Sequence, residues 1–174
     1  MKKLLLALLV ITLFGTFSAM AQSLQEKAKA LVKPADCGVV DYDAFKNSSF
    51  LLKEEVLKTD KNYATVSNDI TRYAKGERKL TVTSVKSDIK KVKSVSTSIK
   101  SLNDKANKLA ESGKNLAANA SKVSPASKIE TIASNTKNSV KAVDLSREIL
   151  KGLSTKANND MGTLNTLLKK AVRR

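Results

Sequence analysis

Apolar residues recur every seven positions through the middle of this 174-residue chain. Between residues 85 and 123, one repeating position carries aliphatic or small side chains. A second position, three residues further on, does the same with Asp88 as its exception. An a/d pattern sustained over five heptads favours a coiled-coil helix, which we predict over residues 78–123. The predicted seam of this helix consists of Val85, Val92, Val95, Ile99, Leu102, Leu109 and Leu116.

Two flanking runs also have the helical period. Residues 41–75 place apolar or aromatic side chains at most positions of two seven-residue series, and Gly76 then interrupts the pattern. The third run, predicted as a helix over residues 125–172, starts at Pro125, because proline is tolerated in a first turn but not in a helix interior. Gly152 costs about 1 kcal/mol against alanine in a helix, so we expect a kink or break near it.

Three helical runs joined by short connections predict an all-α fold. We expect an elongated antiparallel helical hairpin or three-helix bundle with coiled-coil character. Pairing about the Ser124-Pro125 turn would place Gly113 near Thr136 and Ile99 near Leu150. The helix over 41–75 would cover the open side of the hairpin or seal a dimer, so self-association is expected.

The N-terminus has the pattern of an export signal. Lys2 and Lys3 precede an apolar run, and Ala19-Met20-Ala21 forms a small-x-small cleavage site. We predict a signal peptide over residues 1–21 and export to the bacterial periplasm or beyond. An uncleaved N-terminal anchor is the alternative, because the apolar run approaches the length that spans a bilayer. Residues 22–40 are predicted to form a short helix and a loop.

The residue types present argue against catalysis. The chain has no histidine and one cysteine, so the usual metal-binding and nucleophile–base groupings cannot be assembled. Asp36, Asp41 and Asp43 cluster near Cys37, but their spacing lacks the glycine and the distal glutamate of a calcium loop. We therefore expect no enzyme activity, no metal site and no cofactor.

Cys37 is the single cysteine, which excludes an intramolecular disulfide. An odd cysteine in an oxidising compartment suits intermolecular pairing or a free thiol. Two interpretations stay open at this point: a small buried residue near a turn, and a disulfide that links two copies of the chain.

The lysines follow the heptad frame as well. The chain carries 32 basic and 16 acidic residues, and in the middle run Lys86, Lys93, Lys100 and Lys114 all fall at the outward b position. This lysine stripe is either a solvated face that keeps a long bundle soluble or a binding surface for an anionic partner. Given the export signal, the expected anionic partners are envelope polymers or a lipid surface, and no nucleic acid is expected.

One resemblance bears on function. The segment CGVVDYDAFKNSS at residues 37–49, followed by a long basic helical hairpin, resembles the Skp/OmpH family of periplasmic chaperones. The resemblance implies a short β segment before helical tentacles and trimeric, cage-like holding of unfolded outer-membrane proteins. The C-terminal stretch NNDMGTLNTLLKKAVRR departs from that pattern, because it is helical in character and supplies no returning strands.

From the residues alone we expect a non-enzymatic structural or interaction protein of the bacterial cell envelope that binds protein partners. The alternative is a basic periplasmic chaperone or a binder of anionic envelope polymers or lipids, acting through the lysine stripe.

Overall fold

The computed structural model describes residues 23–173 and contains three long helices. They are α2 (Val40–Ala74), α3 (Val82–Asn119) and α4 (Ile129–Val172), and residues 23–30 form a further short helix. Two short 3₁₀ turns, η1 (Ala120–Lys122) and η2 (Ala126–Lys128), connect α3 to α4. The all-α prediction is confirmed. The predicted signal peptide lies outside the described residues.

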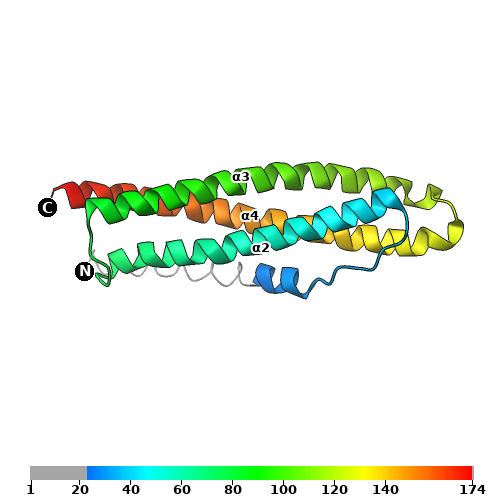
Figure 1. Ribbon diagram of the computed structural model, residues 1–174, viewed down its shortest axis with the longest axis horizontal. Helices are drawn as coiled ribbons and strands as arrows, with labels where there is room; N and C mark the ends of the chain where they lie inside the picture. The colour runs from blue at the N-terminus through cyan, green and yellow to red at the C-terminus, as the bar shows by residue number, and fades with distance from the viewer. Residues whose placement is uncertain (1–22, 174) are drawn as a thin grey trace, which may run out of the picture.

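The three helices lie side by side in an elongated bundle, as Figure 1 shows. α3 runs antiparallel to both α2 and α4, so the α2–α3 connection and the C-terminal end of α4 lie at one end of the rod. Residues 31–39 run beside the rod from the short helix to the start of α2. No strand forms within residues 23–173, so the short β segment implied by the Skp/OmpH resemblance is not found there.

The boundary between α2 and α3 differs from the predicted one because local capping decides it. Gly76, with φ of +74°, ends α2 in the left-handed conformation that glycine adopts without strain. α3 then begins at Val82 and not at residue 78, since Thr81 and Ser84 form a capping box. In this box the Ser84 backbone N–H donates to Thr81 Oγ1 at 3.1 Å.

The connection around Pro125 also differs from the predicted helix ends. α3 ends at Asn119 and α4 begins at Ile129, because the intervening chain tightens into the two 3₁₀ turns. In contrast, α4 passes Gly152 without interruption, so the predicted break there is wrong. Leu150 and Leu153 on either side are buried, and this packing offsets the weak helix propensity of glycine.

The core lies along the axis between the three helices. One continuous cluster contains Val85, Val92 and Ile99 of α3 together with Leu150 and Leu164 of α4. Leu52, Val56, Tyr63 and Ile70 of α2 complete it, and each is at most 2% exposed. The most buried of the apolar heptad positions thus pack within a single chain, and α2 covers the open side of the hairpin.

Small side chains allow close approach where α3 nears its C-terminal end. A Cβ atom added to Gly113 would lie 2.7 Å from Phe45 Cζ and 3.0 Å from Val140 Cγ2. The α4 neighbour of Gly113 is therefore Val140, one helical turn beyond the Thr136 of the predicted register.

Candidate interaction surface along the α3–α4 edge

The lysine stripe lies on the outside of α3. Lys86, Lys93, Lys100 and Lys114 are all exposed, and none takes part in the ion pairs found within residues 23–173. Successive members seven residues apart are separated by about 10.5 Å, because the helix rises 1.5 Å per residue. Their ammonium groups are free to bind water or an anion.

The predicted seam divides into two levels of burial. Val85, Val92 and Ile99 are at most 3% exposed, whereas Val95, Leu102, Leu109 and Leu116 are partly buried and pack against the edge of the core or of a smaller cluster. At the end of this group the Tyr42 hydroxyl of α2 donates to the Leu116 carbonyl at 3.0 Å, so α2 contacts α3 there. A salt bridge of 2.8 Å between Lys105 and Glu55 joins the same two helices.

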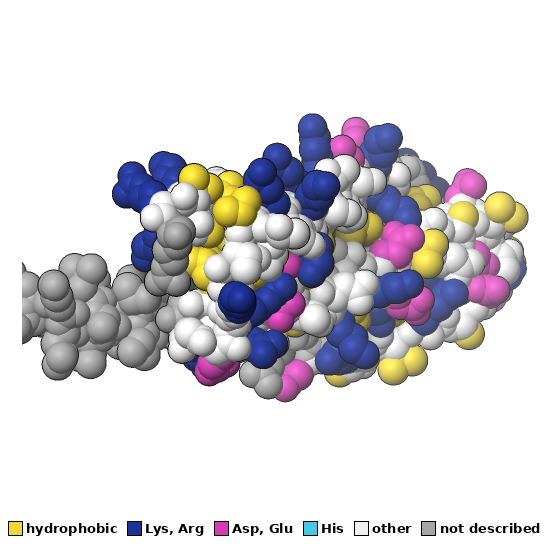
Figure 2. Space-filling model, turned by 60° about the vertical axis from the view of Figure 1, so that its left-hand side comes forward, with side chains coloured by type: hydrophobic (Ala, Val, Ile, Leu, Met, Phe, Trp, Pro, Cys, Tyr) yellow, Lys and Arg dark blue, Asp and Glu magenta, His cyan; other side chains and the backbone are white. Residues whose placement is uncertain are grey.

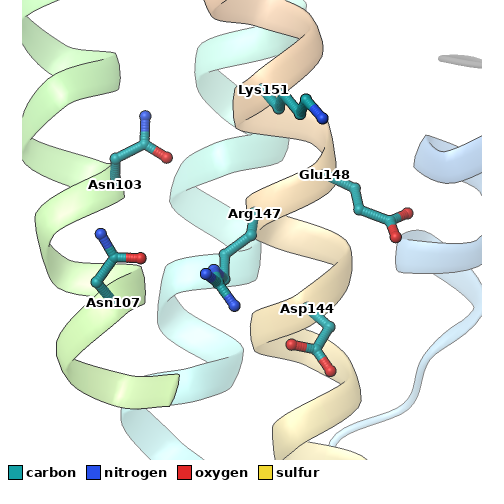
Figure 3. A pocket seen from close by; sticks show the side chains of 6 residues that line it. All are labelled: Asn103, Asn107, Asp144, Arg147, Glu148 and Lys151. Carbon is teal, nitrogen blue, oxygen red and sulfur yellow. The ribbon is translucent and has the colours of Figure 1, made fainter. Parts of the chain in front are cut away.

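A groove opens on the other side of α3, against α4. It has a volume of about 460 Å³ and is lined by Asn103, Asn107, Asp144, Arg147, Glu148 and Lys151. Figure 3 shows Arg147 reaching from α4 toward Asn107, while Glu148 points away from α3. Asn107 is seven residues from both Lys100 and Lys114, so it occupies the position where the lysine stripe is interrupted. The stripe therefore follows the α3–α4 edge.

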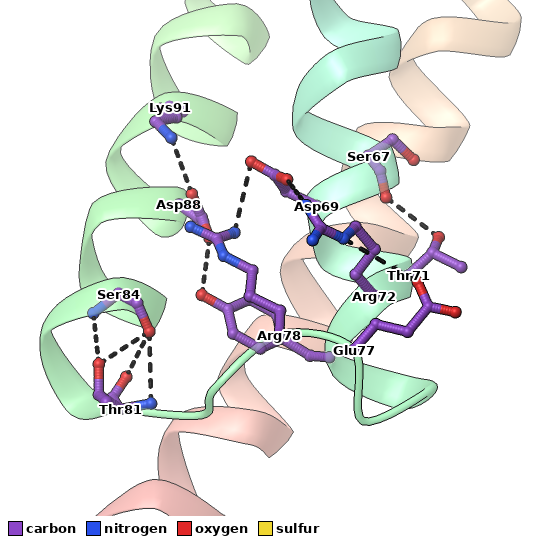
Figure 4. Close-up of polar contacts among 11 residues, drawn as sticks. Ser67, Asp69, Thr71, Arg72, Glu77, Arg78, Thr81, Ser84, Asp88 and Lys91 are labelled. Atoms are coloured by element: carbon purple, nitrogen blue, oxygen red, sulfur yellow. Dashed lines mark hydrogen bonds and ion pairs between the residues drawn. The ribbon is translucent and has the colours of Figure 1, made fainter.

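Two acidic side chains of the hairpin, Asp88 and Asp160, are turned toward α2, whereas Asp144 and Glu148 at the groove are exposed. Asp88, the exception in the heptad pattern, is fully buried and accepts hydrogen bonds from the Tyr73 hydroxyl at 3.0 Å and Lys91 Nζ at 3.0 Å. Arg78 Nη1 lies 2.5 Å from the same carboxylate, and Asp69 lies 3.5 Å from Arg78. Figure 4 shows this polar cluster next to the α2–α3 connection. Because Asp88 is buried among cations and a hydroxyl, its charge is compensated inside the protein.

Tyr73 takes part in the same cluster. Its ring lies 4.7 Å from the Arg78 guanidinium carbon, which places the cation over the aromatic face. Burial raises the pKa of Tyr73, and the hydrogen bond to Asp88 acts in the same direction. The hydroxyl therefore stays protonated and keeps donating to the carboxylate at ordinary pH.

Asp160 of α4 is held in a similar way. Its carboxylate accepts a hydrogen bond of 2.6 Å from the hydroxyl of Tyr63, a residue whose side chain is fully buried. Burial and the neighbouring carboxylate raise the pKa of Tyr63. Tyr63 therefore remains a donor, and Asp160 directs its charge toward the core and away from the lysine stripe.

The acidic cluster around Cys37 has a structural explanation. Asp43 accepts hydrogen bonds of 2.9 Å from the backbone N–H groups of both Cys37 and Gly38. The buried Lys46 forms ion pairs with Asp36 and Asp43. Burial by itself would raise the pKa of Asp43, but these hydrogen bonds outweigh it and the pKa is lowered. For Lys46 burial likewise opposes the charge, yet its two carboxylate partners raise its pKa.

Cys37 is a free, buried cysteine beside Tyr42, Ala120 and Ile132. This environment matches the interpretation of a small buried residue near a turn. The disulfide-linked dimer stays a prediction, and it would require the loop to open before the thiol could react.

Sequence reasoning missed the groove residues on α4 and the tyrosine–aspartate pairs. Asp88 alone gave a signal, because a charged residue stood at an apolar heptad position. Within residues 23–173 no grouping of three or more acidic or cysteine side chains has metal-binding geometry. Over the same range, no helix is both long enough and apolar enough to cross a membrane.

Comparison with protein-family models, curated proteins and solved structures finds no match to this chain.

Proposed function

We propose that this chain is an exported, non-enzymatic interaction protein of the bacterial cell envelope that binds protein partners through the outer faces of a pre-folded helical bundle. The observation that supports this most is the separation of roles among the heptad positions. The most buried apolar residues of the bundle pack within one chain, whereas the outward heptad positions carry exposed lysine, serine and asparagine side chains. Such a rod offers long polar surfaces without having to refold.

The export half of the proposal rests on the first 21 residues. Its test is fractionation of cells that produce the full chain, followed by N-terminal sequencing of the protein recovered outside the cytoplasm. A mature protein that begins at Gln22 is expected. A full-length protein retained in the cytoplasm would contradict this half.

The interaction half is tested by recovering partners of the tagged mature protein from an envelope fraction at low and at high salt. Protein partners that bind through shape and hydrogen bonds to neutral polar side chains should remain at high salt, since screening acts mainly on exposed charges. Recovery of unfolded outer-membrane proteins would favour the chaperone function that the Skp/OmpH resemblance implies.

A second candidate function is favoured by the exposed and unpaired lysine stripe. It is the binding of an anionic envelope polymer or lipid, and such binding falls steeply as the salt concentration rises. Loss of all partners at moderate salt would support this second function over the first.

A further inference from the structure

The positive charge of the bundle is concentrated toward one end. The part of the hairpin nearest the α2–α3 connection, residues 82–101 with 151–173, contains ten basic and two acidic residues. The part nearest the Pro125 turn, residues 102–150, contains eight basic and five acidic residues. The charge available to a partner therefore differs strongly between the two ends of the α3–α4 edge.

The two acidic residues of the basic part compensate only one of its surface lysines, Lys91, among the ion pairs within residues 23–173. They are Asp88, which is fully buried against Arg78, Tyr73 and Lys91, and Asp160, which accepts the Tyr63 hydroxyl. Asp88 is buried and Asp160 is partly buried, so positive charge predominates on the outward surface of this part.

The groove establishes which α4 residues lie beside the lysine stripe. Asn107 of α3 and both Asp144 and Lys151 of α4 line it together. Because the helices are antiparallel, seven-residue steps from this point lead along α3 to Lys100, Lys93 and Lys86, and along α4 from Lys151 to Asn158 and Asn165. These residues form a basic track, and all of them are exposed: Lys86, Lys93, Lys100, Lys151, Asn158 and Asn165.

The track has a definite extent. From Lys86 to Lys100 it runs about 21 Å in a straight line, because the helix rises 1.5 Å per residue. Beyond Lys100, Asp144 and Glu148 add two exposed carboxylates beside Arg147, so the run of uncompensated positive charge ends at this acidic boundary. Lys114 lies past this acidic boundary and is therefore outside the track. Figure 2 shows how Lys and Arg side chains spread over one face of the molecule.

We propose that the basic track binds a linear polymer of phosphate groups laid along the α3–α4 edge. Lysine ammonium groups are compact point charges that suit phosphate, and the asparagine amides of α4 donate hydrogen bonds to its oxygens. A flat membrane surface fits less well, because the six track residues include no apolar side chain that could enter the headgroup region. This inference rests on the second candidate function.

The test measures binding of linear polyphosphate to the mature protein by fluorescence anisotropy at several salt concentrations. Lys86→Gln/Lys93→Gln/Lys100→Gln is the track variant. Lys114→Gln/Lys137→Gln/Lys141→Gln is the matched control, since it removes the same charge from exposed lysines beyond the acidic boundary. Glutamine preserves helix propensity, and circular dichroism checks that both variants fold.

We expect the track variant to bind about tenfold more weakly, with a shallower salt dependence, and the control to stay within about threefold of the unaltered protein. Tripolyphosphate, which is too short to reach from Lys86 to Lys100, should compete poorly. Equal losses in the two variants, or none in the track variant, would overturn the assignment to the track while leaving polyanion binding intact.

Two further outcomes distinguish polyanion binding in general from binding of a phosphate polymer in particular. Absence of binding to both polyphosphate and anionic vesicles, even at low salt, would overturn the second candidate function together with the track. Tighter binding to vesicles of anionic phospholipid than to polyphosphate at equal phosphate concentration would overturn the choice of a polymer and identify a membrane surface as the partner.

Discussion

At the residue scale, Gly113 shows how one side chain sets the distance between helices. Phe45 of α2 and Val140 of α4 occupy the space where a Cβ atom would be. Gly162, in α4, has open space at the same position. The two glycines therefore respond differently to the same substitution, although both lie in helices.

Gly113→Ala is expected to lower the free energy of unfolding by about 1–3 kcal/mol, because overpacking outweighs the gain in helix propensity. Gly162→Ala is the control and should raise it by about 0.5–1 kcal/mol. Urea denaturation followed by circular dichroism measures both. A stabilising Gly113→Ala would mean that the helices separate more easily than the packing indicates.

Asp88 is the other residue whose surroundings determine how strongly its substitution changes stability. Asp88→Ala should lower the free energy of unfolding by about 2–4 kcal/mol, since it leaves Arg78 and the Tyr73 hydroxyl without their carboxylate. Asp104→Ala, on the exposed face of the same helix, should change it by less than about 0.5 kcal/mol. Similar small effects in both variants would show that the cluster contributes little to stability.

At the element scale, the helices could be predicted from the sequence but their ends could not. The seven-residue period is a local property of the sequence. The helices predicted from it over residues 41–75, 78–123 and 125–172 match the long helices of residues 23–173 in number and order. The ends depend on caps and on 3₁₀ turns, which involve two or three residues each. Some contacts join residues up to 100 positions apart. Tyr63 pairs with Asp160, and the Asn135 amide donates to the carbonyl of Ala35 in the segment 31–39. No local sequence pattern encodes such contacts.

The loop before α2 is held by a carboxylate whose ionisation depends on pH in the acidic range. The lowered pKa of Asp43 means that its contribution to stability is present above its ordinary value of 3.8 and is lost as the pH falls below that value. Asp43→Asn should therefore lower the free energy of unfolding by about 1–3 kcal/mol at pH 7, and by clearly less at pH 3.

The measurement is urea denaturation of the variant and the unaltered protein at both pH values. Asp41→Asn, an exposed neighbour in the first turn of α2, is the control and should show the smaller effect of a helix-terminal charge, about 0.3–1 kcal/mol. If the Asp43 effect were equal at pH 7 and pH 3, ionisation of this carboxylate would not be the source of its contribution.

At the scale of the whole molecule, burial of the seam depends on all three helices. Val85, Val92 and Ile99 belong to one cluster with residues of both α2 and α4. A fragment of residues 80–174, which lacks α2, exposes part of this cluster. We expect its helix content to rise with protein concentration as copies associate, whereas that of the full mature chain should not. Circular dichroism over a hundredfold range of concentration tests this, and a fragment whose helix content is independent of concentration would contradict it.

The uneven distribution of charge along the bundle also has a consequence for how the molecule moves. Residues 56–101 and 151–173 carry 16 basic and 5 acidic side chains, whereas residues 23–55 and 102–150 carry 13 and 11. A rod with this imbalance has a large permanent electric dipole along its long axis. In the electric field of a negatively charged partner the rod rotates during its approach, so that most encounters begin with the end at the α2–α3 connection.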